Sequence, residues 1–394
     1  MFETLSALPA DPILGLSVAC RLDNNPNKID LGIGVYKDSD GNTPVLKSVQ
    51  QAQQEYLGRE TSKAYMPMPG SEGANEAVQA LIFGADRDRS RIRTSQTTGG
   101  TGALRIAAEL IKRAKPDATV WISDPSWGNH RPLLEDAGLN IEVYPYYDET
   151  TRSVRFDAMS EALKQAGKDD VVLLHGCCHN PCGADLNKEQ WQAVADLALD
   201  KGFTPFIDLA YQGFGDGLEE DAFGARLMAS LVPELIVASS CSKNFGLYRE
   251  RTGSLSILCE NSERADIGFS QVLNIVRAIY SMPPSNGSLI VETILNDSAL
   301  TSQWHSDLDE MRTRIKSLRS LLSTRLNACP GIEQDFSFIE QQHGMFSYLG
   351  ISPAQVKTLK EEYSIYMLGS SRINVAGINA NNIDYFTSSI ESVL

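Results

Sequence analysis

Three residues that can do chemistry follow one short apolar run. The run at residues 235–238 is typical of a buried strand, and Ser240, Lys243 and Arg251 come soon after it. A lysine that can lose its proton forms Schiff bases with carbonyl cofactors, and an arginine binds phosphate through its forked guanidinium group. An ordinary surface lysine at a strand end would give the same pattern, so this segment alone fits both interpretations equally.

Two other apolar runs also end in polar side chains. Residues 171–174 lead to Asn180, and residues 204–207 lead into Asp208 and Tyr211. Ligands of open α/β sheets lie beyond the carboxyl ends of the strands. We therefore expect an amide, a carboxylate, a phenol and an amine to meet in one crevice.

A glycine-rich turn at residues 97–102 begins a helix that runs towards Lys112. The free N–H groups and the positive dipole end of such a helix favour an anion. The spacing fits neither the dinucleotide fingerprint nor a phosphate loop that ends in Gly-Lys-Ser/Thr, and a plain structural cap is the alternative. An anion pocket, a Schiff-base lysine and an aspartate for a ring nitrogen are what pyridoxal phosphate requires, so the three segments together predict this cofactor.

Cys177, Cys178, His179 and Cys182 raise the alternative of a metal site. Adjacent cysteines are poor joint ligands for one tetrahedral ion, and no C-x-x-C pair supplies the remaining ligands. A cysteine–histidine protease pair is equally disfavoured, because nothing marks one cysteine as exposed and activated. We therefore predict that no metal takes part.

The elements that position these groups follow from the length and the pattern of the chain. With 394 residues, of which 42% are hydrophobic, we expect about two domains with a large core. Between residues 119 and 258, apolar strands alternate with helical stretches, which is typical of an open, mostly parallel α/β sheet. The expected strands are residues 119–122, 171–174, 204–207, 235–238 and 254–258.

Helices are expected at three further places. Apolar spacing predicts one at residues 45–57, and a capping box formed by Asn187 and Gln190 precedes another that reaches Leu199. After residue 284, apolar residues at helical spacing predict a long helix, followed by a smaller α+β unit. These residues are Met311, Ile315, Leu318 and Leu322.

The charge balance and the cysteines limit the partners and the location. The chain has 35 basic and 50 acidic residues and a net charge of -15, so nucleic acids and anionic membranes would repel it. Seven cysteines without framework spacing fit the reduced thiols of the cytoplasm. We find neither an export signal at the N-terminus nor an apolar run long enough to span a bilayer, so we expect a cytoplasmic protein.

Several motifs occur in the order found in the class I aminotransferases, and the chain resembles the branch of aspartate and aromatic amino acid aminotransferases over nearly its whole length. The motifs lie at residues 100–105, 125–130, 179–181, 208–214 and 242–248. The resemblance implies the fold type I of pyridoxal-phosphate-dependent transferases, with a mostly parallel seven-stranded sheet flanked by helices in a large domain, and a smaller α+β domain. It also implies a homodimer that shares its active sites. The implied division is an arm at 1–12, a small domain at 13–43 and 311–394, and a large domain at 44–310.

The resemblance also implies a role for each matching residue that touches the cofactor. Lys243 would bond to the cofactor and shuttle the proton, while Asp208 would pair with the pyridine nitrogen. Tyr211 and Asn180 would hydrogen-bond the ring oxygen, and Trp127 would stack on the ring. The phosphate ligands would be Gly100, Thr101, Ser240, Arg251 and, from the other subunit, Tyr65. The residues behind these groups would be His130 and His175.

Substrate binding, as implied by the resemblance, depends mainly on two arginines. Arg372 would clamp the α-carboxylate, Arg277 would reach a side-chain carboxylate across the dimer, and Gly34 would leave space above the substrate, next to Trp127 and Asn180. The implied reaction is a ping-pong exchange of the amino group between an L-amino acid and a 2-oxo acid such as 2-oxoglutarate or oxaloacetate.

Four residues depart from the commoner pattern of the aspartate enzymes. Ile279 and Met282 replace an asparagine and a small polar residue, Cys182 replaces a threonine, and Ser371 replaces a glycine. Apolar neighbours would weaken the polar hold on Arg277 and accommodate an aromatic ring. We therefore predict activity on aspartate and glutamate and also on phenylalanine and tyrosine. The alternatives are an enzyme that prefers aromatic substrates, a β-lyase or decarboxylase with the same cofactor, and a non-catalytic relative.

Overall fold

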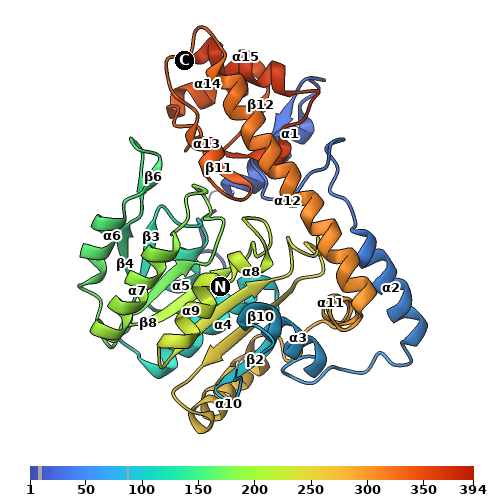
Figure 1. Ribbon diagram of the computed structural model, residues 1–394, viewed down its shortest axis with the longest axis vertical. Coiled ribbons are helices and arrows are strands. Elements are labelled where there is room, and N and C mark those ends of the chain that lie inside the picture. The colour runs from blue at the N-terminus through green and yellow to red at the C-terminus, as the bar shows by residue number, and fades with distance from the viewer. Residues whose placement is uncertain (8–10, 87) are drawn as a thin grey trace.

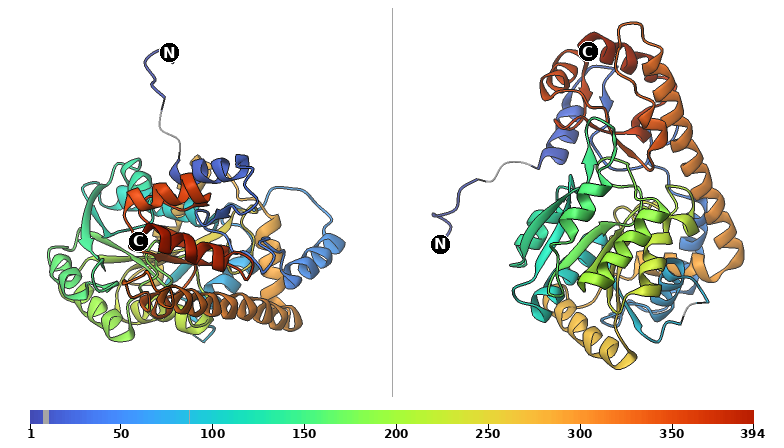
Figure 2. Two further views of the ribbon diagram at one scale, coloured as in Figure 1. Left: turned by 90° about the horizontal axis from the view of Figure 1, so that it is seen from above. Right: turned by 60° about the vertical axis from the view of Figure 1, so that its left-hand side comes forward.

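The computed structural model describes residues 1–7, 11–86 and 88–394. These form a larger α/β part and a smaller part around the C-terminal elements (Figure 1). Residues 1–7 stand away from the body of the molecule (Figure 2). Residues 8–10 of the predicted N-terminal arm lie outside the described residues.

The larger part is built on one seven-stranded sheet with the strand order β2-β10-β9-β8-β7-β3-β4. Strand β10 runs antiparallel to both of its neighbours, and all other adjacent strands run parallel. The strands are β2 (Ile92–Thr98), β3 (Thr119–Asp124), β4 (Asn140–Pro145), β7 (Val171–His175), β8 (Thr204–Leu209), β9 (Leu235–Ser240) and β10 (Thr252–Leu258). This confirms the predicted mostly parallel sheet and adds β2 and β4 to the five expected strands.

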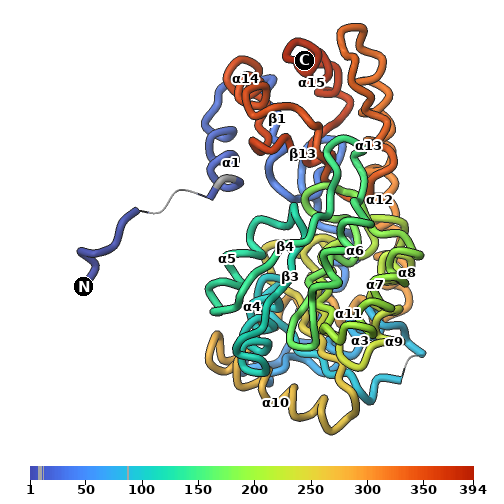
Figure 3. The backbone as a smooth tube through the Cα atoms, turned by 90° about the vertical axis from the view of Figure 1, so that its left-hand side faces the viewer, coloured from blue at the N-terminus to red at the C-terminus, as the bar shows by residue number. Residues whose placement is uncertain are grey.

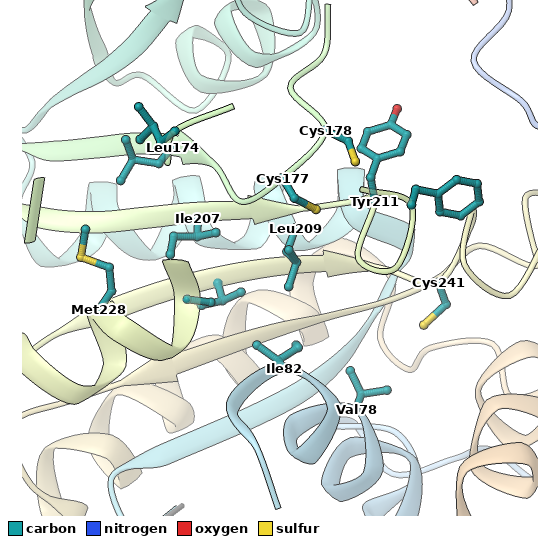
Figure 4. Close-up of a cluster of buried hydrophobic side chains, with 14 of the residues drawn as sticks. Val78, Ile82, Leu174, Cys177, Cys178, Ile207, Leu209, Tyr211, Met228 and Cys241 are labelled. Carbon is teal, nitrogen blue, oxygen red and sulfur yellow. The ribbon is translucent and has the colours of Figure 1, made fainter. Parts of the chain in front are cut away.

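Side chains of the central strands alternate between two buried faces of the sheet. On β7, Val171 and Leu173 pack on the side of helices α4, α5 and α10, whereas Val172 and Leu174 pack on the side of α3, α7 and α9. Figure 4 shows the second side, where Leu174 and Met228 of α9 belong to one cluster. These helices are α3 (Glu72–Phe83), α4 (Gly99–Ala114), α5 (His130–Glu135), α7 (Lys188–Lys201), α9 (Phe223–Leu231) and α10 (Ser262–Ile279). Burial on both sides explains why these strands are continuous apolar runs in the sequence.

The long helix α12 (Ser298–Asn327) connects the two parts along one side of the molecule (Figure 3). Met311 and Ile315 belong to the core of the larger part, whereas Leu318 and Leu322 belong to the core of the smaller part. The predicted domain boundary after residue 310 therefore falls inside a continuous helix. The division into domains stays a prediction.

The smaller part joins residues from both ends of the chain. Strand β1 (Ile29–Asp30) pairs in parallel with β12 (Ile365–Tyr366), and β11 (Phe346–Tyr348) pairs antiparallel with β13 (Arg372–Asn374). The helices around them are α1 (Pro12–Leu22), α13 (Phe338–Gln341), α14 (Pro353–Tyr363), η1 (Val375–Gly377) and α15 (Ile383–Val393). This pairing brings the segment that follows β1 next to Arg372.

The remaining helices include those that the sequence predicted. Helix α2 spans Lys47–Arg59, close to the expected 45–57, and α7 begins with the capping box of Asn187 and Gln190. The other elements are β5 (Tyr147–Asp148), β6 (Ser153–Val154), α6 (Phe156–Leu163), α8 (Leu218–Asp221) and α11 (Asn286–Asn296). Across the described ranges, no helix has both the length and the apolar character that crossing a membrane requires.

Candidate active site

A cavity of about 260 Å³ lies beyond the carboxyl ends of β7, β8 and β9, as the sequence predicted. The segments that follow β2 and β3 also contribute to its walls. The predicted site residues that line it are Gly34, Gly100, Thr101, Trp127, His175, Asn180, Asp208, Tyr211, Ser240, Lys243, Arg251 and Arg372. His130, Tyr65 and Arg277 are the predicted site residues that do not.

The amine of Lys243 lies over the ring of Tyr211, with 4.5 Å between Nζ and the ring centroid. Burial lowers the pKa of Lys243 to about 8, an effect that the Asp208 carboxylate opposes and that Arg251 reinforces. This amine therefore loses its proton far more readily than an ordinary lysine. A nucleophile that attacks a carbonyl needs this property.

The Asp208 carboxylate is held from behind by His130, at the start of α5. Nε2 of His130 donates to Oδ2 of Asp208 over 3.0 Å. Burial alone would raise the pKa of Asp208, but this hydrogen bond and the nearby His130, His175 and Lys243 together hold it below its usual range. An anionic carboxylate that lines the cavity suits a protonated ring nitrogen.

A chain of contacts continues behind His130. Its Nδ1 lies 2.8 Å from Oγ of Ser126, which lies 3.3 Å from Nε2 of His175. His175 packs against His179, with 3.9 Å between the ring centroids. Burial, with His130 as a lesser cause, lowers the pKa of His175 to about 3. This ring is therefore neutral at neutral pH and orients its neighbours rather than acting as an acid.

The first turn of α4 and the residues that follow β9 form a pocket suited to a phosphate group. A Cβ atom at Gly99 would lie 2.5 Å from Nη2 of Arg251, and one at Gly100 would lie 3.1 Å from Cβ of Ser240. Only glycine brings the N–H groups of this helix end so close to the guanidinium group and the hydroxyl group. With Lys243 and Asp208 on the same cavity, these residues fit pyridoxal phosphate.

Arg372 lies on β13 and is almost fully buried, at 3% exposure. Its Nη1 donates to Oδ1 of Asn180 over 3.3 Å, and its Nη2 donates to the carbonyl oxygen of Gly32. Its Nε has no hydrogen-bond partner anywhere in the described chain. A buried N–H group without a partner is costly, so this guanidinium group is suited to receive a carboxylate.

Gly34 and Trp127 lie on the cavity wall as expected. A Cβ atom at Gly34 would lie only 2.9 Å from Cζ of Phe346, so a side chain there would displace that ring. The Trp127 ring meets the His130 ring edge to face, with 5.2 Å between centroids. Trp127 is therefore positioned by the same histidine that holds Asp208.

Tyr65 and Arg277 lie on the surface of the single chain. Tyr65 is 89% exposed. Arg277 donates through Nη1 to Oγ of Ser281, and the same nitrogen lies 3.8 Å from Sδ of Met282. Ile279 is 47% exposed and has no part in this contact. Both Tyr65 and Arg277 were expected to act in a partner subunit, and this role stays a prediction.

The two other departures from the family pattern are buried. Sγ of Cys182 lies 3.2 Å from Nδ1 of His179. Ser371 has a φ of 63°, in the left-handed region that favours glycine, and its Oγ accepts a hydrogen bond from the N–H of Gly350 over 3.0 Å. Each of these two side chains therefore forms a hydrogen bond with a neighbouring group.

The cysteines that raised the metal alternative are buried next to the cavity. Sulfur atoms of Cys177 and Cys178 and a carboxylate oxygen of Asp221 lie within 4.8 Å of one another. Figure 4 shows both cysteines in the segment that follows β7. Burial raises the pKa of Cys178 to about 12, and the Asp221 carboxylate already accepts N–H groups of Gly213 and Gly215. Because metals bind thiolates, protonated thiols of this kind are poor ligands.

The cavity residues that the sequence analysis did not predict include Phe346 and Tyr248. Phe346 packs beside Arg372, and Tyr248 accepts a hydrogen bond at its hydroxyl oxygen from the N–H of Tyr36 over 2.8 Å. Tyr248 lies within the motif at 242–248, which was a usable signal. Phe346 carries no local signal, because its place depends on contacts with residues far away in the chain.

Known proteins resemble this chain over its whole length. Residues 26–390 match the family described as aminotransferase class I and II. The chain is 49% identical to the aspartate aminotransferase of Haemophilus influenzae and 45% identical to the aromatic-amino-acid aminotransferase of Paracoccus denitrificans, with 100% of both chains covered in each case. It superposes with a TM-score of 0.97 and 43% identity on the aromatic-amino-acid aminotransferase from Burkholderia pseudomallei covalently bound to pyridoxal phosphate, covering 100% of this chain and 99% of that one.

Proposed function

Because the chain belongs to the class I and II aminotransferases and is an enzyme that uses pyridoxal phosphate, we propose that it transfers amino groups between dicarboxylic amino acids and 2-oxo acids and also accepts phenylalanine and tyrosine. The relatives that support this are an aspartate enzyme and an aromatic one. The observation that carries the proposal is the cavity itself, where a lysine amine with a pKa of about 8 shares the walls with the Asp208 carboxylate and the phosphate pocket.

We assign the cofactor contacts from the residues that line the cavity. When bound, pyridoxal phosphate supplies a carbonyl group for an amine and a ring that accepts electrons. Lys243 supplies that amine and holds the α-proton of the substrate at Nζ during transfer. Asp208 would keep the ring nitrogen protonated, and Trp127 would stack on the ring. Tyr211 and Asn180 would bind the ring oxygen. The phosphate would be held by Gly100, Thr101, Ser240 and Arg251.

Substrate choice follows from the two arginines. Arg372 binds the α-carboxylate of every substrate, which provides about 1.5–3 kcal/mol per charge-assisted hydrogen bond. Arg277 of the partner subunit selects a second carboxylate. Its neighbour Met282 offers only a weak sulfur acceptor, so Arg277 is held less firmly than by an amide. This favours a site that also admits an aromatic ring, and an enzyme that prefers aromatic substrates is the second candidate.

A homodimer is part of the proposal, because Tyr65 and Arg277 then complete the site of the other subunit. Large apolar side chains that are exposed on the single chain support it. Val45, just before α2, is 53% exposed, and Leu57, within α2, is 57% exposed. Ile279 at the end of α10 is 47% exposed. Where such side chains join into one patch, they mark association sites. We further propose that the enzyme works in the cytoplasm, as its seven free cysteines indicate.

The first experiment locates the covalent attachment of the cofactor. The enzyme is incubated with pyridoxal phosphate, reduced with borohydride and digested, and mass spectrometry should find the modification on Lys243 in the native enzyme and nowhere in Lys243→Ala. A native enzyme without modification at this residue would refute the assignment.

The second experiment measures kcat/KM for a panel of amino donors with 2-oxoglutarate as acceptor. We expect turnover of aspartate and glutamate together with phenylalanine and tyrosine. Turnover of aromatic donors alone would select the second candidate.

A further inference from the structure

A fully buried guanidinium group lies outside the cavity, on α12. Arg319 is 2% exposed. Within the described chain, its hydrogen bonds all go to backbone carbonyl oxygens, and these belong to one segment, residues 339–346, which runs from α13 through a short connection to the first residue of β11 (the 339–346 loop). The carbonyl oxygens are those of Ile339 at 2.9 Å, His343 at 3.0 Å, Gly344 at 2.9 Å and Phe346. Burial of a charge is costly, and here the charge ties together the end of α13, the connecting residues 342–345 and the start of β11.

This loop carries Phe346 into the cavity. The Phe346 ring lies under the guanidinium group of Arg372, with 4.5 Å from Cζ to the ring centroid. It also meets the ring of Tyr211 edge to face at 5.9 Å. A cation over an aromatic face is attracted to it, so the ring helps to fix the orientation of Arg372. Because Arg319 binds the carbonyl group of Phe346 itself, loss of that bond would move the backbone that carries the ring.

The same loop supports the second neighbour of Arg372. The N–H of His343 donates to the carbonyl oxygen of Gly183 over 2.8 Å. A Cβ atom at Gly183 would lie 3.0 Å from Nη2 of Arg319, so the two chain segments meet around this guanidinium group. Gly183 lies in the same short segment as Asn180, whose Oδ1 accepts a hydrogen bond from Arg372. Two of the three groups that hold the Arg372 guanidinium group, the Phe346 ring and the Asn180 amide, therefore depend on the packing around Arg319, and the third is the carbonyl oxygen of Gly32.

We propose that Arg319 is a positioning residue for the substrate carboxylate, because it fixes, through residues 339–346, the Phe346 ring and the segment that carries Asn180, which are two of the three groups that orient Arg372. The inference rests on the proposed function, in which Arg372 binds that carboxylate. Lysine would keep the charge at position 319. However, its single nitrogen cannot span four carbonyl groups that the forked guanidinium group reaches in several directions.

The test compares two ligands that bind different ends of the site. Succinate, a dicarboxylate without an amino or 2-oxo group, is titrated into the cofactor-loaded enzyme by calorimetry. Inorganic phosphate is titrated into the cofactor-free enzyme. We expect Arg319→Lys to raise the Kd of succinate about tenfold and to leave the Kd of phosphate unchanged. The residues that form the phosphate pocket, Gly99, Gly100, Ser240 and Arg251, lie outside the 339–346 loop.

Arg91 offers a matched control, because its guanidinium group also binds backbone carbonyl oxygens, those of Cys259 at 2.7 Å and Pro233 at 2.8 Å, away from the cavity. Arg91→Lys should change neither dissociation constant. An unchanged succinate Kd in Arg319→Lys would overturn the inference, and so would an equal rise in both constants, which would mean general loosening.

Two further variants keep the test decisive. If Arg319→Lys does not fold, Phe346→Leu replaces it, with the same expected rise in the succinate Kd, and an unchanged value there overturns the inference. Arg372→Lys distinguishes failure of the proposed role of Arg372 from failure of the proposed role of Arg319. Unchanged succinate binding in Arg372→Lys refutes the proposed role of Arg372. Weakened binding there, together with native binding in Arg319→Lys, refutes only the role of Arg319.

Discussion

The cofactor-free enzyme should contain one lysine amine that titrates near pH 8. Burial lowers the pKa of Lys243 from 10.5 to about 8, against the opposing effect of Asp208. At pH 7 about 9% of such an amine is free base, roughly 300-fold more than for a pKa of 10.5. Asp208→Asn removes the charge that raises this pKa. It should therefore move the midpoint below 8 by about one unit, the usual effect of a nearby opposite charge.

The assay is pH-dependent modification of the cofactor-free enzyme with a small amine-reactive reagent, followed by digestion and mass spectrometry of the peptide that contains Lys243. Surface lysines in the same digest serve as the internal reference. The rate of modification should rise with pH and reach half of its plateau near pH 8 in the native enzyme and at a lower pH in Asp208→Asn. A midpoint near 10.5 in the native enzyme, or an upward shift in the variant, would refute the reasoning.

The same shift has a consequence for stability. The folded-state pKa of Lys243 lies below the unfolded value, so between pH 8 and 10.5 the unfolded chain binds more protons than the folded one. The contribution of this group to the free energy of unfolding therefore increases with pH across that window, by at most ~3 kcal/mol. Urea unfolding of the native enzyme and of Lys243→Met should show this increase in the native enzyme alone.

Three other changes test the site. Met282→Asn should shift the ratio of kcat/KM for aspartate over phenylalanine towards aspartate by about tenfold, since an amide holds Arg277 better than the sulfur does; an unchanged ratio would contradict this. Gly34→Ala places a Cβ atom 2.9 Å from Cζ of Phe346 and should raise KM for phenylalanine about tenfold. An unchanged KM would show that the Phe346 ring moves aside without affecting substrate binding. Tyr248→Phe removes the acceptor of the Tyr36 N–H and should lower the free energy of unfolding by ~1–3 kcal/mol. Urea unfolding measures this change, and an unchanged midpoint would contradict the prediction.

The sheet could be predicted where its strands are buried on both sides. Strands β7, β8 and β9 are continuous apolar runs, and their expected positions were correct. Strand β2 was missed because it contains mostly threonine, serine and glutamine. Its side chains are satisfied by hydrogen bonds such as that between Thr94 and Ser256 at 2.8 Å, which depend on the neighbouring strand. A polar strand that is stabilised by its neighbour leaves no apolar signal in the sequence.

The cavity could be predicted for a related reason. Parallel strands place their carboxyl ends on one edge of the sheet, so local motifs sufficed to bring Asn180, Asp208 and Lys243 together. Phe346 and Arg319 escaped prediction because their roles depend on contacts across the two parts of the molecule. Arg319 lies on an amphipathic helix where an arginine is normally a surface residue. Only the arrangement of the loop reveals that its guanidinium group is buried.

The four departures from the aspartate pattern now separate by what they touch. Ser371 has a left-handed backbone, but its hydroxyl group accepts the N–H of Gly350, and Cys182 is buried in the core, where its hydrogen bonds go to His179 and to the carbonyl oxygen of Ala184. Both are therefore changes that the fold absorbs. Met282 contacts Arg277 directly, and Ile279 lies exposed on the same helix end. The preference between a second carboxylate and an aromatic ring should consequently respond to substitution at 282 and hardly at all at 182 or 371, because of these three side chains it is Met282 that contacts Arg277, the arginine that distinguishes the two substrates.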